Sequence, residues 1–390
     1  MSSSAAPKAK VIVFGILFWY PLAGVTFQFL HYLLGLRRLG YDVYYVEDSG
    51  RHVYDPLLND LSPDATSNIA AVAPLLHSFG FENRWVFRGK YPGGKCYGMT
   101  EQQLLELYAD ADAFFNVTGA QEIREEHSVI PRRIYVESDP FVLQAKVAQG
   151  DSAIISQLAA HDTHFSFGEN IGAPDCLVPT GRFHWLPTRQ PVVMDLWRNQ
   201  HPPGRAFNTI TTWHNKGREL LYDGQTYHWT KDREFENFLD LPLLRPVPFE
   251  LATSVSPDVR QRLVAKGWRQ VDSIRLSSDI NVYRNYIQSS RGEFTVARDQ
   301  YVRPRTGWFS DRSVCYLASG RPVITQETGF SKYVASGKGL HGFTQMDQIL
   351  AAVDKIAADY PGECKAAAEI AQAYFGHERV LKSLLDRAGL

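Results

Sequence analysis

The amino-terminal segment of the chain constrains the fold most strongly. No Asp, Glu, Lys or Arg lies between Lys10 and Arg37, and most of this stretch is apolar. A stretch of that kind is typical of a signal peptide or a membrane-spanning helix. Here Pro21 and Gly24 break it into two short pieces. We therefore expect neither a secretory segment nor a membrane span in this part of the chain.

The two apolar pieces and the residues after them match a strand–helix–strand unit. Residues 11–17 are rich in β-branched side chains and predict a buried strand. Residues 25–39 place polar side chains at helix-compatible spacing and end at Gly40, a common helix stop. Residues 41–48 predict a second buried strand with acidic residues at its exit. The continuous apolar character of both strands indicates a parallel sheet.

Strand-like and helix-like segments go on alternating through the chain, which predicts an α/β fold with mostly parallel sheets. In such sheets, ligands bind outside the carboxyl ends of the strands. The further expected strands are residues 113–118, 133–140, 164–168, 206–213, 292–298 and 322–325. The further expected helices are residues 66–79, 101–109, 141–149, 279–289, 310–319, 347–359 and 362–388.

The length of 390 residues predicts two domains, because single domains usually have roughly 100–200 residues. Between the two runs of alternating segments, a stretch rich in Pro, Arg and Trp lacks both helical and strand periodicity, and we interpret it as the linker. We expect an amino-terminal domain at residues 1–190, the linker at 191–205, a carboxyl-terminal domain at 206–370 and a final helical segment at 371–390.

Charge and cysteine content narrow the function and the compartment. The 41 Lys and Arg residues balance the 42 Asp and Glu residues and give a net charge of −1. This balance argues against a general nucleic-acid-binding protein, which depends on neutralising phosphates. The four cysteines are scattered and form no CxxC pair, as expected in a reduced compartment such as the cytoplasm.

A loop rich in Arg, Gly and hydroxyl side chains precedes the expected helix at residues 310–319. The free N–H groups and the dipole of a helix amino terminus attract anions. Arg303, Arg305 and Arg312 can add charge-assisted hydrogen bonds, so we expect a diphosphate here. A solvated surface is the alternative for these arginines. If Arg312 binds the diphosphate, Arg312→Ala should lower activity while leaving the fold intact.

Three segments resemble the GT-B glycosyltransferases. Residues 318–324, Ala-Ser-Gly-Arg-Pro-Val-Ile, resemble the A-x-G-x-P-V-I segment of that family. Residues 36–43 resemble the L-x-x-L-G-Y-D-V segment of its first domain, and residues 363–388 resemble the carboxyl-terminal helices that cross back onto that domain. The resemblance implies two Rossmann-like domains that face each other across a cleft.

The resemblance also implies an activity: transfer of a sugar from a nucleotide-sugar donor to a hydroxyl of a small-molecule or glycan acceptor. The second domain would hold the donor, such as a UDP-, dTDP- or GDP-sugar, and the first domain would hold the acceptor. No metal and no further cofactor are implied, and the pair His161 and His164 lacks other ligands at metal-site spacing. The alternatives are a nucleotide-sugar epimerase of the same fold and a two-domain protein that binds a ligand without chemistry.

One departure concerns stereochemistry. Many retaining members of the family carry a Glu-x7-Glu pair around the helix that faces the donor, and the matching positions here are Gly307 and Cys315. No carboxylate pair replaces them, so the sequence leaves the inverting and retaining outcomes open.

The candidate donor-binding residues lie in the loops described above and after the strand at residues 206–213. They are Thr212, Lys216, Arg218, Arg305, Ser310, Asp311, Arg312, Ser313, Glu327, Thr328 and Gly329. Each group has an ordinary alternative: a solvated basic loop at 216–218, helix capping by the two serines, and a polar turn at 327–329.

The candidate acceptor site lies in the first domain. Inverting transfer needs a general base near the attacking hydroxyl, and Asp139 at a strand exit is the leading candidate. An Asp-Pro turn that caps the next helix is the alternative for it. The other candidate bases are Glu47, Asp48, His31 and Glu169. The candidate acceptor contacts are Trp19, Tyr20, Gly24 and Glu47, and burial in the core is the alternative for the two aromatic side chains.

Overall fold

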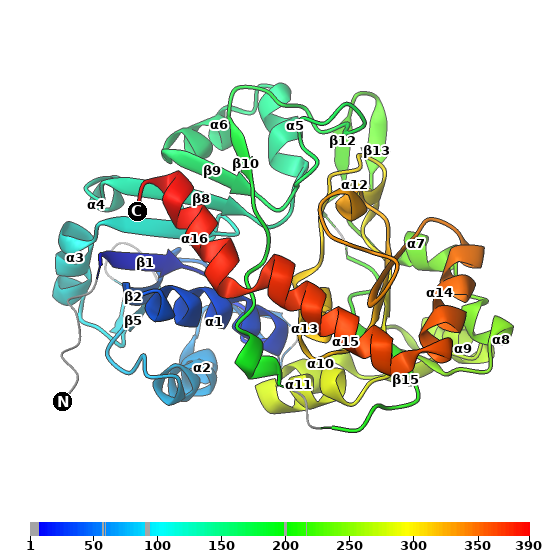
Figure 1. Cartoon of the computed structure of the whole chain (residues 1–390). Coiled ribbons are helices and arrows are strands. Elements are labelled where there is room, and N and C mark those ends of the chain that lie inside the picture. The colour runs from blue at the N-terminus through cyan, green and yellow to red at the C-terminus, as the bar shows by residue number, and fades with distance from the viewer. Residues whose placement is uncertain (1–7, 57, 59, 90–93, 199–200, 216) are drawn as a thin grey trace.

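The chain forms two α/β halves that lie side by side. The structure, a computed structural model, describes residues 8–390 except residues 57, 59, 90–93, 199–200 and 216. Each half is built around its own sheet, and the last helices run across both halves (Figure 1). The described helices include none that is both long enough and apolar enough to cross a membrane.

The first half contains an eight-stranded sheet of order β10-β9-β8-β7-β1-β2-β5-β6, in which every neighbouring pair is parallel except β5 and β6. Its strands are β1 (Lys10–Phe14), β2 (Asp42–Glu47), β5 (Trp85–Arg88), β6 (Cys96–Tyr97), β7 (Ala113–Val117), β8 (Arg132–Glu137), β9 (Thr163–Ser166) and β10 (Trp185–Pro187). The side chains of residues 11–14 are fully buried, which explains their uninterrupted apolar character.

Helices and a small hairpin surround this sheet. They are α1 (Ala23–Arg38), α2 (Thr66–Ser78), α3 (Glu101–Asp110), α4 (Glu125–Ser128), α5 (Val142–Ala148), α6 (Ser152–Ala159), and the strands β3 (Val53–Asp55) and β4 (Asp60–Ser62). Helix α1 confirms the expected strand–helix–strand unit. The chain leaves it through Gly40, whose φ of 93° lies in the left-handed region that favours glycine.

The second half contains a six-stranded parallel sheet of order β15-β14-β11-β16-β17-β18. Its strands are β11 (Phe207–Ile210), β14 (Phe249–Ala252), β15 (Arg269–Val271), β16 (Gly292–Thr295), β17 (Val323–Gln326) and β18 (Leu340–Phe343). Its helices are α7 (Asp232–Glu236), α8 (Leu241–Leu244), α9 (Pro257–Ala265), α10 (Ser273–Ser277), α11 (Ile280–Gln288), α12 (Asp299–Val302), α13 (Asp311–Ala318) and α14 (Met346–Ala358).

The carboxyl-terminal segment connects the halves. The prediction of one helix over residues 362–388 is wrong, because α15 (Tyr360–Ile370) continues through a π-helical turn and then breaks at Gly376, which has extended backbone. Helix α15 packs against α13 of the second half, and α16 (His377–Ala388) packs against α1 of the first. The chain therefore crosses back onto the first half, as the family resemblance implies.

The stretch between the sheets is not free of regular structure. Strand β10 extends the first sheet as far as Pro187, and a 3₁₀ turn covers Met194–Trp197. The expectation of an irregular stretch is therefore wrong in part, and the domain boundaries at residues 191 and 205 stay a prediction.

A hairpin in the second half is one of the elements that the sequence interpretation missed, together with α6, α9 and β14. Strands β12 (Leu220–Tyr222) and β13 (Gln225–Tyr227) are joined by Asp223 and Gly224, which have φ values of 49° and 70°. An Asp-Gly pair with both residues in this region is a strong hairpin signal, so the sequence did carry the information. The hairpin lies beside α5 of the first half (Figure 1).

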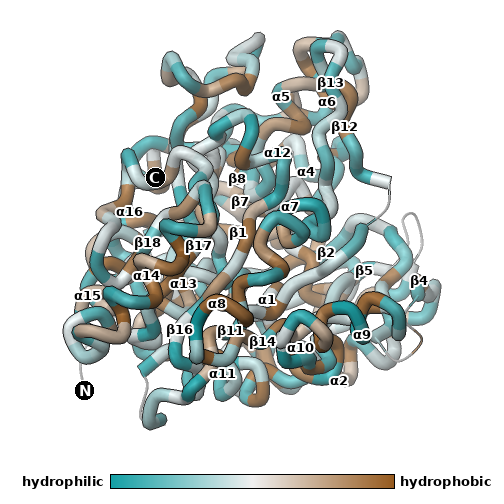
Figure 2. Tube along the Cα trace, turned by 90° about the vertical axis from the view of Figure 1, so that its right-hand side faces the viewer, coloured by the Kyte–Doolittle hydropathy of each residue, from teal (hydrophilic) through white to brown (hydrophobic). Residues whose placement is uncertain are grey.

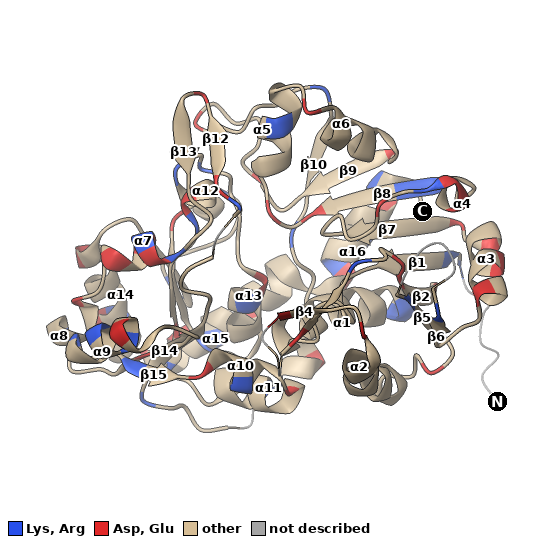
Figure 3. Cartoon of the chain, turned by 180° about the vertical axis from the view of Figure 1, so that it is seen from behind, with Lys and Arg blue, Asp and Glu red and all other residues tan. Residues whose placement is uncertain are grey.

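Apolar side chains from both halves share one buried cluster, next to further clusters that belong to a single half. Val13 and Leu33 of the first half belong to the same buried cluster as Leu317 of the second, and Phe375 and Leu381 of the carboxyl-terminal segment join them. Hydrophobic residues gather along the inner strands, whereas hydrophilic residues dominate the outer loops (Figure 2). The ribbon in Figure 3 shows Lys and Arg and also Asp and Glu scattered over both halves.

Candidate active site

A cleft of about 350 Å³ lies between the two halves. The first half contributes Gly24, Ser138 and Asp139 to its walls, and the second half contributes Thr212 and the start of α13. Asp139 follows the end of β8, and Thr212 follows the end of β11. The cleft therefore lies at the carboxyl ends of strands from both sheets, as expected for an α/β fold.

The amino terminus of α13 opens into this cleft. Ser310 occupies the capping position, is 5% exposed, and makes no side-chain capping hydrogen bond. Ser313 in the first turn is fully buried, and its hydroxyl oxygen has no hydrogen-bond partner among the described residues. The first turn thus keeps N–H groups, and Ser310 keeps a hydroxyl, that a bound anion can satisfy, whereas Ser313 does not line the cleft.

Among the described residues, three cationic side chains line the cleft: Lys231, Arg298 and Arg312. Lys231 is 6% exposed, and its ammonium group has no hydrogen bond or ion pair with any described residue. Burial, together with the charges of the two arginines, lowers the pKa of Lys231 well below its ordinary value. Desolvated cations held close together form a strong site for a polyvalent anion.

Arg312 differs from Lys231 because its charge is already compensated. Its Nε lies 2.6 Å from Oε1 of Glu293, which is fully buried. Its two other nitrogens donate to the carbonyl oxygen of Ile210 at 2.8 Å and to the hydroxyl of Thr295 at 2.9 Å. Arg312 lines the cleft as expected, and its role at a phosphate stays a prediction, but its guanidinium also holds β11, β16 and α13 together.

Asp139, the leading candidate base, belongs to the first half but is held by the second. Its Oδ1 accepts hydrogen bonds from the hydroxyl of Tyr301 and, at 3.2 Å, from Arg298. The indole N–H of Trp308 donates to the carbonyl oxygen of the preceding Ser138 at 2.9 Å. The carboxylate is 42% exposed and faces the cleft. A carboxylate fixed by both halves is well placed to meet ligands bound between them.

Asp311 is a second carboxyl in the cleft, at the first turn of α13. Burial raises the pKa of this carboxyl, and the nearby charge of Asp139 acts in the same direction.

Several candidate donor residues do not line the cleft. Glu327 accepts a hydrogen bond from the backbone N–H of Gly329 at 2.6 Å, and Thr328 donates to the carbonyl oxygen of Trp308 at 2.5 Å. These contacts shape the loop after β17. Arg305 forms an ion pair with Asp175 at 2.8 Å instead of entering the cleft. Lys216 lies outside the described residues, so the structure does not place it.

Arg218 lies in a neighbouring hollow that we call the side chamber. This hollow also has a volume of about 350 Å³ and shares Ser138 and Asp139 with the cleft. Its walls further include Glu137, Lys146 and Trp229. The Arg218 guanidinium is 5.2 Å from the centre of the Trp229 ring.

Among the candidate acceptor residues, Gly24 lines the cleft and Glu47 does not. Glu47 is 2% exposed, and its carboxylate accepts hydrogen bonds from the backbone N–H groups of Phe18 at 2.8 Å and Trp19 at 2.6 Å. Burial raises the pKa of Glu47 to about 8. The expected acceptor role of Glu47 is therefore wrong, because its side chain instead holds the loop after β1.

The aromatic residues of that loop contact one another. The rings of Trp19 and Tyr20 are 4.9 Å apart, and the ring of Tyr20 is 5.5 Å from that of Tyr54. Neither Trp19 nor Tyr20 belongs to the walls of the cleft or the side chamber.

The other candidate bases have structural partners. The backbone N–H of Val193 and the indole N–H of Trp197 point at the two ring nitrogens of His31, at 3.1 Å and 3.2 Å. Glu169 forms an ion pair with Arg189 at 2.6 Å. Asp48 is fully buried beside Arg88. These contacts leave Asp139 as the candidate base that faces the cleft.

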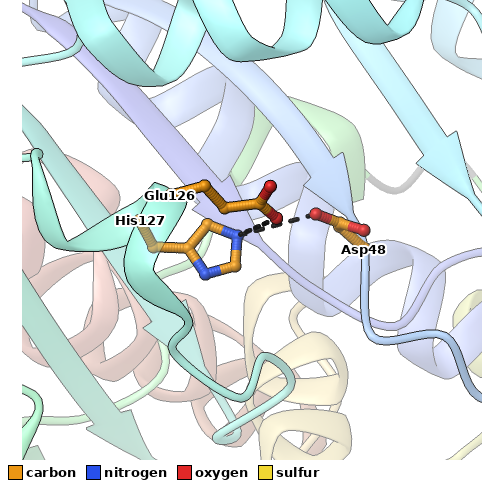
Figure 4. A group of neighbouring side chains, drawn as sticks. All are labelled: Asp48, Glu126 and His127. Carbon is orange, nitrogen blue, oxygen red and sulfur yellow. Dashed lines mark ion pairs between the residues drawn. The ribbon is translucent and has the colours of Figure 1, made fainter. Parts of the chain in front are cut away.

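The grouping of Asp48, Glu126 and His127 has the ligand types of a metal site (Figure 4). The Nε2 atom of His127 lies 3.6 Å from both carboxylates. Arg88 and Arg124 also bind these carboxylates and already compensate their charge. Because a metal would have to displace two guanidinium groups, we interpret this grouping as an ion-pair network.

Sequence-based interpretation missed Lys231 and Arg298. Lys231 follows the β12–β13 hairpin and returns to the end of β11, where its backbone N–H donates to the carbonyl oxygen of Trp213 at 3.2 Å. Arg298 stacks on Trp229, with its guanidinium carbon 3.6 Å from the ring centre. No sequence motif marks either residue. Lys231 could have been found by recognising the Asp-Gly hairpin, because it follows that hairpin in the chain.

Comparisons with known proteins bear on the fold. No protein-family model matches the sequence, and no curated protein sequence matches it. Solved structures match over almost the whole chain. An alpha-glucosyltransferase in complex with UDP and a 13-mer DNA containing a central A:G mismatch is 10% identical, with a TM-score of 0.58, and the match covers 98% of this chain and 99% of that one.

Two further structures match in the same way. AviGT4, a glycosyltransferase involved in Avilamycin A biosynthesis, is 12% identical with a TM-score of 0.55, and the match covers 98% of this chain and 97% of that one. Anabaena Alr3699/HepE in complex with UDP and glucose is 10% identical with a TM-score of 0.57, and the match covers 98% and 99%. The chain therefore has the GT-B glycosyltransferase fold, which confirms the expected architecture.

Proposed function

We propose that this chain is a metal-independent glycosyltransferase that transfers a sugar from a nucleoside diphosphate to a hydroxyl acceptor. The observation that carries the proposal is the convergence of Lys231, Arg298 and Arg312 on the amino terminus of α13, in a cleft between two Rossmann-like halves. Proteins of the same fold have been solved with UDP, which makes a UDP-sugar the first donor to test. The free cysteines among the described residues fit the expected cytoplasmic location.

In this proposal the diphosphate binds at the start of α13. Lys231 supplies an unpaired ammonium group, and Arg298 adds a second cation whose buried Nε has no partner among the described residues. The hydroxyls of Thr212 and Ser310 line the same wall. These groups take the part that a metal ion would otherwise play, because they neutralise the charge that develops on the departing diphosphate.

The acceptor hydroxyl attacks the anomeric carbon of the donor. A new carbon–oxygen bond forms, the bond from that carbon to the diphosphate breaks, and the hydroxyl proton passes to Asp139. The contacts of Asp139 with Tyr301 and Arg298 hold it at the junction of the two halves, where donor and acceptor meet.

The test compares three proteins: the wild type, Lys231→Met and Asp139→Asn. Lys231→Met should weaken UDP binding by about 10–100-fold, since hydrogen bonds to charged groups contribute roughly 1.5–3 kcal/mol. Asp139→Asn keeps an oxygen for Arg298 and Tyr301, so it should retain UDP binding and lose acceptor-dependent UDP release. Calorimetric titration and a nucleotide-release assay measure the two effects.

The matched control is Lys365→Met, because the Lys365 side chain is 78% exposed on α15. UDP binding unchanged in Lys231→Met would overturn the donor assignment, and full transfer by Asp139→Asn would remove it as the base. UDP release that needs no acceptor and yields an isomerised sugar would identify an epimerase instead. Thermal shifts with UDP-, dTDP- and GDP-sugars identify the nucleotide, since a ligand that binds the native state raises its stability.

A further inference from the structure

The side chamber differs from the donor cleft in the elements that build it. Helix α5 of the first half forms one wall with Lys146, and the loop and hairpin at residues 217–220 of the second half form another. Asp139 belongs to the walls of both hollows. A ligand in the side chamber therefore reaches the same carboxylate as a ligand in the cleft.

Contacts between the halves hold this chamber together. The ring of Phe141, at the start of α5, lies 4.7 Å from the ring of Tyr227 and 5.8 Å from that of Tyr222. The side-chain amide of Gln149 donates to the carbonyl oxygen of Leu221 at 2.8 Å. The chamber is therefore a built cavity with packed walls on both sides.

The backbone next to the chamber is strained on two neighbouring strands. Thr118, in the chamber wall after β7, has a φ of 63°, and Phe141, which follows Asp139 and Pro140 after β8, has a φ of 96°. Non-glycine residues rarely adopt such angles, and they concentrate at functional sites. The strain thus lies where the two strand ends meet the chamber.

The charges that remain unpaired in the chamber are positive. Neither Lys146 nor Arg218 forms an ion pair with a described residue. Two carboxylates in the wall have charged or titratable partners: Asp139 contacts Arg298, and Oε1 of Glu219 lies 3.1 Å from Nδ1 of His228. An anionic group would supply the missing counter-charge for the two cations.

Glu137 adds an unsatisfied polar group to the wall. One of its oxygens accepts hydrogen bonds from Gln144 at 2.7 Å and Ser166 at 2.5 Å. The other oxygen is buried and has no partner among the described residues, and the residue is 2% exposed. Burial raises the pKa of Glu137 to about 8, so at neutral pH its carboxyl adds little negative charge to the wall.

We propose that the side chamber binds the acceptor, and that this acceptor is a small hydroxyl compound carrying a carboxylate or phosphate group held by Lys146 and Arg218. Its reacting hydroxyl then lies at Asp139, on the border with the donor cleft. The volume of about 350 Å³ is at the small end of the range for ligand pockets, roughly 300–1,000 Å³, and suits a small molecule. The proposal rests on the proposed glycosyl transfer and names its acceptor class.

The test measures binding of matched neutral and anionic probes to the full chain saturated with UDP. The pairs are glucose against glucose 6-phosphate, glucose against glucuronate, and glycerol against glycerol 3-phosphate. We expect the anionic member of at least one pair to bind about tenfold or more tightly than its neutral partner. The comparison of the phosphate and carboxylate probes identifies the preferred group.

The double variant Lys146→Met/Arg218→Met should lose this preference while keeping its melting temperature and UDP affinity. Lys365→Met is the control and should keep the preference. Equal binding of the members of every pair, the absence of binding by all probes, or a preference that survives in the double variant would overturn the acceptor assignment. The UDP-binding test with Lys231→Met does not depend on the probes. A negative result with the probes would therefore reject the acceptor assignment without rejecting the donor site.

Discussion

Arg312 and Lys231 line the same cleft, but only the charge of Arg312 has a described counter-charge. Arg312→Ala would leave Glu293 fully buried without its cation, and an unpaired buried charge costs about 3–5 kcal/mol. We therefore expect Arg312→Ala to unfold at markedly lower denaturant concentration, contrary to the expectation from sequence that the fold stays intact. Chemical denaturation followed by fluorescence measures this change.

The matched variant removes both charges at once. Arg312→Met combined with Glu293→Gln should recover most of the lost stability, since no unpaired charge remains. If Arg312→Ala is as stable as the wild type, the ion pair with Glu293 does not stabilise the fold. Direct binding of phosphate would then be the main role of Arg312.

The lowered pKa of Lys231 predicts that UDP binding is coupled to proton uptake. Its pKa lies below the ordinary value when the cleft is empty, and a diphosphate beside it would raise that pKa again. At a pH between the two values, UDP binding should take up a proton, and affinity should fall as the pH rises. Titration calorimetry in two buffers of different ionisation enthalpy measures the uptake.

Lys231→Met provides the control for this experiment, because it has no ammonium group to protonate. Its proton uptake should be smaller than that of the wild type. Identical uptake by the two proteins would place the titrating group elsewhere.

The sequence predicted the loop before α13 and Asp139 at its strand exit, because strand ends and helix starts are local patterns. It could not predict which charges are compensated. The partner of Arg312 is 19 residues away on another element, and Asp139 is held by Tyr301, 162 residues away. Such pairings depend on how the sheets and the two halves come together.

At the level of elements, the contact between α1 and α16 depends on one glycine. A Cβ atom on Gly35 would overlap the side chain of Leu381 and lie 3.1 Å from Cβ of His377. Alanine favours a helix over glycine by about 1 kcal/mol, but overpacking usually costs about 1–3 kcal/mol. We expect Gly35→Ala to lower the free energy of unfolding, as denaturant titration would measure.

Gly24→Ala in the same helix is the comparison, because its Cβ would find its nearest atom, the Tyr283 hydroxyl, at 3.4 Å. That variant should be close to neutral in stability. In a double-mutant cycle, Gly35→Ala should cost less stability in a Leu381→Ala background than in the wild type, because the smaller side chain makes room for the new Cβ atom. A Gly35→Ala protein more stable than the wild type would show that α1 and α16 do not pack as described.

The elements of the sheets could be predicted where they are long and apolar, as β1, α1 and β7 demonstrate. The break at Gly376 could not, since residues 362–388 keep an amphipathic pattern across it and the extended backbone there is fixed by tertiary contacts. Val192 pairs with Gly376 across that break. The β12–β13 hairpin is different, because its Asp-Gly turn was a local signal that the interpretation overlooked.

At the level of the whole molecule, the shared apolar core predicts cooperative unfolding. The cluster that contains Val13 and Leu33 of the first half also contains Leu317 of the second. We expect one thermal transition whose calorimetric and van 't Hoff enthalpies agree. Differential scanning calorimetry measures both, and UDP should move the single transition upward as a unit.

Two separate transitions, with only one of them shifted by UDP, would contradict this expectation. The chain length and the alternation of strand-like and helix-like segments predicted two halves of similar architecture. They could not predict that α15 and α16 join the halves through one shared cluster, because that packing requires the positions of both sheets.

The seating of the β12–β13 hairpin on α5 has a consequence for chimeric enzymes. Exchanging whole halves at the linker between proteins of this fold is an obvious way to recombine donor and acceptor preferences. Here the second half carries Arg218 and the hairpin into the wall beside Lys146. A chimera that inherits only the first half would receive an incomplete wall of the side chamber, so residues 217–227, which include Arg218 and the hairpin, have to be transplanted with it.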